Sequence, residues 1–440
     1  MQRAIEKTAK YFLEKSKDKD IQIISHFDTD GITSAAILAK TLKTINKRFS
    51  IKIVKQLDKE QIDKLKKQIK KKPAILIFLD LGSSSLDELS GINTDIFIID
   101  HHEISGKPGE NITFINPHLF DKEEISAAGL TYLFSKGINK KNKESANLAL
   151  IGMVGDMLDR NISKSNNQII EDADIVIKKG LLLYPATRPI HKTLEFASSI
   201  FIPGVTGNVK GVLSMLREVG IKKENGKYKS LIELNEEELS KLITTILLRT
   251  KKQDNEIIGN IYLVKFFNRL EDARELSAMI NACSRLGNSN IALSLCIGSK
   301  QARKKAETIY AEYKQHLVSA LNYAAQNKIA GNGYIILNAR DMIKDTIIGT
   351  VASILSMSRE YKEGTVIIAM SYDKEKIKVS ARVAGRNGRN VREILANATE
   401  KIGGECGGHA MAAGCLLPKT KEQEFLKSIA KTLELEVVKI

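Results

Sequence analysis

Cysteine is scarce in this chain. Only four cysteines occur, Cys283, Cys296, Cys406 and Cys415, and no two of them form a CxxC pair. This spacing argues against a disulfide framework and against a structural zinc site. We therefore expect a cytoplasmic protein, which works in a reducing compartment.

Long apolar runs are missing as well. No stretch of about 18 apolar residues occurs, so the sequence predicts no transmembrane helix and no membrane partner. Residues 1–20, MQRAIEKTAKYFLEKSKDKD, contain no apolar signal core with a cleavage site. Their pattern is typical of an amphipathic helix that belongs to the folded protein.

Aromatic residues make up only 5% of the chain and tryptophan is absent, whereas basic residues are in excess. The formal net charge is +16 and the pI is near 9.4. Such an excess favours a polyanionic partner such as nucleic acid, although Lys-rich runs like KKQIKKK (66–72) also occur on ordinary solvated surfaces. Because base stacking needs aromatic rings, we expect binding of a single strand to depend on phosphate contacts and to weaken steeply with salt.

The first part of the chain alternates strand and helix patterns. The runs IQIIS (21–25), AILIFLD (74–80) and DIFIID (95–100) are short, apolar and rich in β-branched residues, as in strands buried on both faces of a parallel sheet. Helical patterns such as GITSAAILAKTLKTI (31–45) lie between them. The alternation predicts an α/β domain with a parallel sheet.

The rest of the chain changes pattern twice, and a length of 440 residues is enough for two or three domains. After about residue 190 the pattern is helical with Gly and Pro breaks, and a long polar helix follows. New strand patterns then precede the glycine-rich GGECGGHAMAAG (403–414). We assign residues 1–190 to the parallel-sheet α/β domain, 191–300 to a helical middle region, 301–330 to a connector helix and 331–440 to a smaller C-terminal α/β domain.

Four segments place acids and histidines after a buried strand or within an apolar helix. They are SHFDTDG (25–31), LIFLDLG (76–82), IIDHHE (98–103) and ALIGMVGDMLD (149–159). In an open parallel sheet, loops at the carboxyl ends of neighbouring strands meet in one crevice. We therefore expect their polar side chains to lie together: His26, Asp28, Asp30, Asp80, Asp100, His101, His102 and Asp156.

A single aspartate at a strand end is more often a helix cap or a turn residue than a metal ligand. A cluster of five aspartates, however, would repel itself unless something compensated the charge. Carboxylate and imidazole ligands without thiolate suit two divalent ions such as Mn²⁺, Mg²⁺, Fe²⁺ or Zn²⁺. Two ions that share a bridging carboxylate would suit hydrolysis of a phosphate ester.

The order HFDTDG, LDLG, DHH and GD resembles the four motifs of the DHH phosphoesterase superfamily. GGECGGHAMAAG resembles the GGHxxAAG signature of the DHH-associated C-terminal domain. Two middle segments, FIPGVTGNVKGVLSMLREVGI (201–221) and ARELSAMINACSRLG (273–287), resemble the archaeal RecJ-like branch, which includes the GINS-associated nuclease. The resemblance covers nearly the whole chain.

The resemblance implies roles for the clustered residues. His26, Asp28 and Asp80 would hold one ion, and Asp80 would bridge to the second. His102 would face the scissile phosphate as a catalytic residue, with Asp100 orienting the histidines. The second ion would be held by Asp30, Asp80, His101 and Asp156.

The resemblance also implies substrate-binding residues. Arg285 would approach a substrate phosphate, although Ser284 stands where bacterial RecJ proteins carry glycine before this arginine. Exposed N–H groups of consecutive glycines suit a phosphate, and the C-terminal domain would hold the single strand; glycine-rich segments that form only tight turns are the alternative. The residues expected to hold the strand there are Ser380, Arg382, Gly407, Gly408 and His409. Nearer the metal site, we expect a structural role for His118 rather than a place in the cleft, and Ser126 as a helix cap.

We therefore predict a hydrolase: a metal-dependent, single-strand-specific exonuclease of RecJ type that uses two divalent ions, Mn²⁺ preferred and Mg²⁺ possible, and releases mononucleotides. Such an enzyme would act in DNA replication or repair, or in RNA trimming. One alternative is a phosphodiesterase of short oligoribonucleotides or cyclic dinucleotides, although the middle region favours a longer substrate or a protein partner. Another is a replisome scaffold that binds the GINS complex and the replicative helicase and whose nuclease activity is incidental.

Overall fold

The computed structural model describes residues 1–437 except 121–122, 161, 198–199, 201, 251–256, 359, 386 and 401. The chain forms two compact units, Met1–Tyr310 and Ala311–Ile440. Within the described residues, no helix is both long enough and apolar enough to cross a membrane.

The first unit is built on a five-stranded sheet in the order β2-β1-β3-β4-β5, and every pair of neighbours is parallel. The three strands predicted from apolar runs are confirmed as β1 (Ile21–His26), β3 (Ile75–Leu79) and β4 (Ile96–Ile99). All residues of β3 and β4 are buried, as expected for the centre of a parallel sheet. The outer strands β2 (Phe49–Val54) and β5 (Ile112–Ile115) are less buried.

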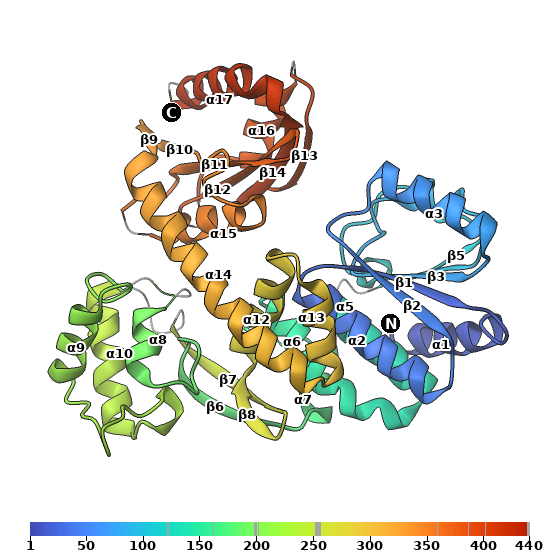
Figure 1. Ribbon diagram of the computed structural model, residues 1–440, viewed down its shortest axis with the longest axis horizontal. Helices are drawn as coiled ribbons and strands as arrows, with labels where there is room; N and C mark the ends of the chain where they lie inside the picture. The colour runs from blue at the N-terminus through green and yellow to red at the C-terminus, as the bar shows by residue number, and fades with distance from the viewer. Residues whose placement is uncertain are drawn as a thin grey trace. The chain divides into compact units, whose positions relative to one another are not determined.

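Helices cover this sheet (Figure 1). The predicted N-terminal helix is confirmed as α1 (Gln2–Lys15), and α2 (Thr29–Thr44) follows β1. Helix α2 is buried along most of its length because α5 and α6 both pack against it. The helices that complete this part are α3 (Lys59–Lys71), α4 (Leu86–Ser90), α5 (Ala127–Ile138), α6 (Ala146–Gly155) and α7 (Lys164–Asp172), with the 3-10 turns η1 (Pro117–Leu119) and η2 (Lys140–Ser145).

The middle of the chain has a hydrophobic core of its own, which includes Ile190, Met215, Leu242 and Ile261. Its helices are α8 (Ile190–Glu195), α9 (Val209–Glu218), α10 (Glu236–Thr250), α12 (Ala273–Arg285) and α13 (Ser289–Ile297), with the 3-10 turn η3 (Leu231–Glu233). The region is not wholly helical. An antiparallel sheet in the order β6-β7-β8 is formed by β6 (Ile175–Leu181), β7 (Ile258–Phe266) and β8 (Arg269–Asp272).

The predicted connector is helix α14 (Lys300–Asn327), which spans the division between the units. The second unit then forms a six-stranded sheet in the order β13-β14-β12-β11-β10-β9, in which only β10 and β11 are parallel neighbours. Its strands are β9 (Ile329–Gly331), β10 (Tyr334–Asn338), β11 (Val366–Asp373), β12 (Lys376–Val383), β13 (Glu405–His409) and β14 (Ala412–Pro418).

One face of this second sheet packs against α16 (Val391–Thr399) and α17 (Glu422–Val437), which the 3-10 turn η4 (Lys419–Lys421) precedes. Val379 and Ala381 of β12 contribute to that core. Side chains alternate between the faces of a strand, so Ser380 and Arg382 lie on the other face. Helix α15 (Asp345–Ser356) covers part of that face, because Ser353 Oγ accepts a hydrogen bond from Arg382 Nε at 3.1 Å.

Candidate metal centre

The predicted metal ligands of the first unit lie together where its central strands end. His26 ends β1, Asp28 caps the N-terminus of α2, and Asp30 lies in the first turn of that helix. Asp80 directly follows β3, and the Asp100–His101–His102 run directly follows β4. Asp156 caps the C-terminal end of α6, which packs beside α2. The four predicted segments therefore converge.

The first cluster comprises His26, Asp28 and Asp80, whose ligand atoms lie close enough to hold one metal ion. His26 Nδ1 lies 3.0 Å from Asp28 Oδ2 and 3.2 Å from Asp80 Oδ2. One imidazole nitrogen and two carboxylates thus face one small volume. This is the set predicted for one ion.

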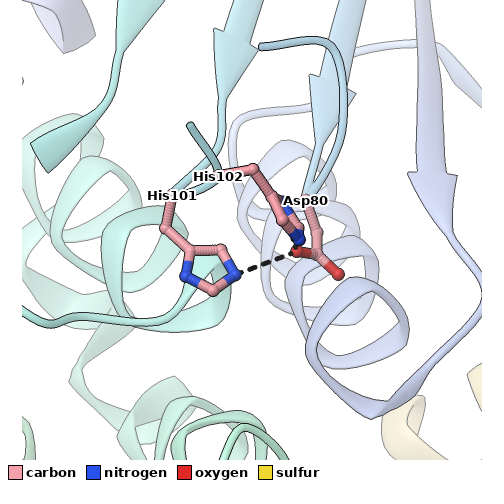
Figure 2. A group of neighbouring side chains, drawn as sticks. All are labelled: Asp80, His101 and His102. Carbon is pink, nitrogen blue, oxygen red and sulfur yellow. Dashed lines mark ion pairs between the residues drawn. The ribbon is translucent and has the colours of Figure 1, made fainter. Parts of the chain in front are cut away.

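The second cluster centres on His101 Nε2. This atom lies 3.4 Å from Asp80 Oδ1, 3.3 Å from Asp156 Oδ2 and 3.9 Å from Asp30 Oδ2. Figure 2 shows His101 and His102 beside the Asp80 carboxylate, with a dashed line between His101 and Asp80. Asp80 therefore turns one oxygen to each cluster, which is the arrangement of a bridging ligand.

The local structure at Asp80 fits such a bridge. Its φ of 59° lies in the left-handed region, which aspartate tolerates better than most residues. The side chain is buried, and Asp80 Oδ1 has no hydrogen-bond partner among the described residues. Asp156 Oδ2 is buried in the same way and also lacks a partner among them. Buried carboxylate oxygens without a hydrogen bond are costly, and a divalent cation would compensate this cost.

The carboxyl and imidazole groups at the centre have strongly shifted pKa values. Burial, helped by the charges of Asp28 and Asp30, raises the pKa of Asp80 to about 7. Burial and the nearby carboxylates raise the pKa of Asp156 well above its usual value. Burial alone would lower the pKa of His101, but the Asp80 carboxylate, 3.4 Å from His101 Nε2, and the charge of Asp30 raise it to about 9. Carboxylates that resist ionisation beside histidines that hold protons form a charge pattern that a bound divalent cation would compensate.

Asp30 has a second task in the fold. Its two carboxylate oxygens accept hydrogen bonds from the backbone N–H groups of Ala127 at 2.6 Å and Ala128 at 2.9 Å. These donors belong to the first turn of α5, whose N-terminus Ser126 caps as predicted by accepting from Gly129 N. A carboxylate at the N-terminus of a helix is stabilised by the helix dipole. Asp30 therefore ties the centre to α5.

Asp100 fixes the two adjacent histidines. Its Oδ1 accepts hydrogen bonds from His102 Nδ1 at 2.7 Å and from the His101 N–H at 2.8 Å, and its Oδ2 accepts from the Ser83 N–H at 2.9 Å. Asp100 thus fixes the ring of His102 through Nδ1 rather than through Nε2. The side chain of His102 is 56% exposed, whereas that of His101 is 24% exposed, so the neighbours occupy different environments.

The predicted substrate residues of the second unit lie at paired positions on the adjacent strands β12, β14 and β13. Ser380 pairs with Gly414, which pairs with Gly407, and Arg382 pairs with Ala412, which pairs with His409. Directly paired residues point to the same face, so Ser380, Arg382, Gly407 and His409 share one face. Gly408 belongs to the opposite face. Its φ of 116° is a backbone conformation that favours glycine, so this residue is needed for the course of the strand. Arg285, in the first unit, lies partly buried at the end of α12.

Comparison with known proteins now adds to this geometry. Family models match the chain in three places: the DHH family N-terminal domain at residues 20–153, the DHH-CID domain at residues 183–257, and the DHHA1 domain at residues 331–435. An uncharacterised protein of Methanocaldococcus jannaschii is 31% identical over an alignment of 443 positions, and this alignment covers 97% of this chain and 96% of that relative. This chain belongs to the DHH family.

Solved structures place this DHH protein in the RecJ-like fold. RecJ of Thermus thermophilus in complex with Mn²⁺ matches with a TM-score of 0.63 and 17% identity over 98% of this chain, which spans only 55% of that longer protein. CDC45 of Entamoeba histolytica matches with a TM-score of 0.66 and 13% identity over 98% of this chain and 99% of its own. The predicted family and fold class are confirmed, while the four-part domain division stays a prediction.

Several supporting residues of the DHH protein were missed by sequence reasoning. Asn116 is buried, and its Nδ2 donates to Ser83 Oγ at 3.0 Å and to the carbonyl of His102 at 2.9 Å. Asn281 of α12 accepts a hydrogen bond from the Thr29 N–H at 3.0 Å, across 252 positions of sequence. An asparagine that supports a distant loop carries no local motif, so only the fold identifies it.

Proposed function

We propose that this DHH protein is a metal-dependent phosphodiesterase that removes mononucleotides from an end of single-stranded DNA or RNA. The observation that carries the proposal is a pair of adjacent possible metal sites, His26–Asp28–Asp80 and Asp30–His101–Asp156, which Asp80 joins because its Oδ1 lies 3.4 Å from His101 Nε2. The fold likeness to RecJ bound to Mn²⁺ supports the same conclusion. So does the net charge of +16, which favours a polyanionic substrate.

We assign the residues of each cluster to one of the two ions. His26, Asp28 and Asp80 would hold one ion, and Asp80 would share its second oxygen with the other. When bound, two divalent ions lower the pKa of a water nucleophile and neutralise charge on the scissile phosphate. Oxygen and nitrogen donors without sulfur suit Mn²⁺, with Mg²⁺ as a further candidate. The other ion would be held by Asp30, Asp80, His101 and Asp156.

His102 is assigned to the substrate. Its hydrogen bond to Asp100, together with the charge of that carboxylate, raises the pKa of His102 despite partial burial. The imidazole therefore stays protonated to a higher pH than a free histidine. A proton on Nε2 would then stabilise charge on the phosphate or pass to the leaving oxygen. Asp100 acts through His102 and is a positioning residue.

Other residues are assigned to holding the strand. Ser380, Arg382 and His409 would contact phosphates, beside the open backbone of Gly407. Desolvation lowers the pKa of Arg382, and a hydrogen bond between its guanidinium and a phosphate would be charge-assisted and strong. Arg285 is assigned to a phosphate in the first unit.

The proposal is tested by incubating the wild type, Asp80→Asn and the control Asp63→Asn with Mn²⁺ and four kinds of substrate: end-labelled strands of DNA, the same strands of RNA, a dinucleotide and a cyclic dinucleotide. Asp63 is an exposed residue of α3 and serves as a matched acid outside the centre. Mononucleotides released by the wild type and the control, but not by Asp80→Asn, would support the exonuclease. Cleavage of only dinucleotides or cyclic dinucleotides would replace it with the small-substrate alternative.

A scaffold role is the second candidate, favoured by the full-length fold likeness to CDC45. In that case the protein would bind the GINS complex and the replicative helicase. Recovery of these subunits with the protein from its own cells, combined with Mn²⁺ binding but no cleavage of any strand, would establish the scaffold and reject the nuclease.

A further inference from the structure

A cavity of about 350 Å³ adjoins the metal centre within the first unit, and His101 forms part of its wall. Its size is near the lower end for small-molecule pockets, about 300 Å³, so it suits one small organic group rather than a length of strand. His118 also lines it. The side chain of His118 is exposed, which corrects the expectation of a purely structural histidine.

The cavity combines apolar walls with a flat ring. Pro117, Ile125 and Leu158 supply the apolar surface, and the imidazole of His118 stands beside them. Aromatic side chains and apolar surface are what a nucleobase stacks against, and stacking tolerates any base. The walls therefore suit a heteroaromatic ring better than a phosphate.

The position of His118 is coupled to the metal centre through Asn116. The side-chain oxygen of Asn116 accepts a hydrogen bond from the His118 N–H at 2.8 Å. Its nitrogen donates to the carbonyl of His102 at 2.9 Å. One buried amide thus fixes the cavity loop against the loop that carries the two adjacent histidines.

Acidic groups border the cavity. Glu123 and Glu124 line it, and the described lining residues include no lysine or arginine. The Glu123 carboxylate is engaged, because it accepts hydrogen bonds from the N–H and the hydroxyl of Ser165 at 2.6 and 2.8 Å. Glu124 is exposed. A carboxylate repels a phosphate but accepts hydrogen bonds from hydroxyl and amino groups.

We propose that this cavity binds the terminal nucleoside of the substrate, with its base against His118 and with Glu124 disfavouring an end that carries a further phosphate. The inference rests on the proposed function, since a phosphodiester at the metal centre places one neighbouring nucleoside at the adjacent wall. It gives a physical reason for release of single nucleotides, because only one nucleoside fits beyond the scissile phosphate.

The test measures binding rather than cleavage. A nucleoside monophosphate and the corresponding 3′,5′-bisphosphate are titrated calorimetrically into the full-length protein with Mn²⁺. His118→Ala should weaken binding of the monophosphate about 10-fold, because stacking of one base is worth about 1–3 kcal/mol. Glu124→Lys should strengthen binding of the bisphosphate relative to the monophosphate. Glu110→Lys, an exposed change before β5 and so at the other end of the strands, should alter neither.

The possible results distinguish failure of the cavity assignment from failure of the proposed exonuclease function. Wild-type affinity in His118→Ala, or an unchanged preference in Glu124→Lys, in a protein that does trim strands would overturn the cavity assignment alone. A protein that cuts no strand yet shows both binding changes would overturn the proposed exonuclease and leave the nucleoside site in place.

Discussion

At the scale of single residues, Asp80 is the carboxylate that faces both ligand clusters. It is 2% exposed, faces His26 with one oxygen and His101 with the other, and keeps Oδ1 without a hydrogen bond among the described residues. In the absence of metal this carboxylate destabilises the fold at neutral pH, because burial raises its pKa to about 7. A cation bound by the proposed ligands would offset this cost.

Asp80→Asn should therefore separate stability from metal binding. Asparagine tolerates the left-handed backbone and removes the buried charge, so we expect the metal-free protein to gain about 1–3 kcal/mol at pH 8. The increase in melting temperature on adding Mn²⁺ should largely disappear. Thermal unfolding with EDTA and with Mn²⁺ measures both effects.

Asp80→Ala is the matched comparison, because alanine also removes the charge but incurs about 1–2 kcal/mol of strain at the φ of 59°. It should be less stable than Asp80→Asn. A metal-free Asp80→Asn protein that melts below the wild type would contradict this account of the charge.

Most of the centre could be predicted at this scale, because acids and histidines directly after buried strands are visible in the sequence. Asp30 was predicted as a ligand, but its hydrogen bonds to the start of α5 were not, since they join residues 97 and 98 positions apart. Asn116 and Asn281 were missed as supports for the same reason. His118 was misjudged because a histidine after Asn-Pro gives no sign of the cavity beside it.

At the scale of elements, the centre depends on how closely α6 approaches α2. A Cβ added at Gly152 would lie 2.5 Å from the Cβ of Ala128 and 2.7 Å from Asp30 Oδ1. Glycine here lets the helix that carries Asp156 reach the helix that carries Asp30. The central strands of the sheet were predictable from their apolar runs, whereas this close approach of the two helices was not.

Gly152→Ala should push α6 away from α2. Overpacking of this kind costs about 1–3 kcal/mol, and the shift of Asp156 should weaken Mn²⁺ binding as well. Chemical denaturation and metal titration by calorimetry measure the two effects. Gly91→Ala is the control, because its Cβ would meet only the flexible Lys66 side chain, with Nζ at 3.4 Å, and the Glu88 carbonyl oxygen at 3.5 Å. Equal stability of the two variants would rule out the proposed role of Gly152.

Strand β13 of the second unit offers a second matched pair of glycines. Gly408→Ala should destabilise that unit strongly, because φ is 116° and the Cβ would lie 2.5 Å from the Ala412 carbonyl oxygen. Gly407→Ala should fold normally, since its Cβ meets no described atom within 4 Å. The methyl group would nevertheless occupy the face of Ser380, so single-strand binding should weaken by about 10-fold, or about 1.4 kcal/mol.

Fluorescence anisotropy with a labelled single strand, and unfolding followed by circular dichroism, distinguish the two effects of these glycines. Unimpaired strand binding in Gly407→Ala would exclude this face as the strand-binding surface. The glycine-rich motif was visible in the sequence, but only the register shows which glycine serves the fold and which the open face.

At the scale of the whole molecule, the titrating groups of the centre set how stability depends on pH. Asp80 and His101 bind protons more tightly in the folded than in the unfolded chain, with pKa values of about 7 and about 9. Their contribution to stability is thus present at low pH and is lost as pH rises through these values. Metal binding acts in the opposite direction, because the ligands must lose their protons.

The metal-free protein should therefore lose stability between about pH 5 and about pH 9, and the stabilisation by Mn²⁺ should grow over the same range. Melting temperatures in EDTA and in Mn²⁺ across this range give both trends. The Asp80→Asn variant should show a flatter metal-free profile near the pKa of about 7 that Asp80 has in the wild type. A stabilisation by Mn²⁺ that declines as pH rises would be incompatible with carboxylate and imidazole ligands.

The left-handed backbone of Asp80 has a genetic consequence. One nucleotide change turns an aspartate codon into an asparagine codon, and asparagine is among the few residues that tolerate this left-handed backbone. Under the proposed function, a lineage could therefore lose hydrolysis through a single mutation and retain a folded, more stable protein. Descendants of such a mutation would be free to evolve as binding proteins. In a fold of this design, one mutation at the shared carboxylate is therefore enough to replace catalysis by binding.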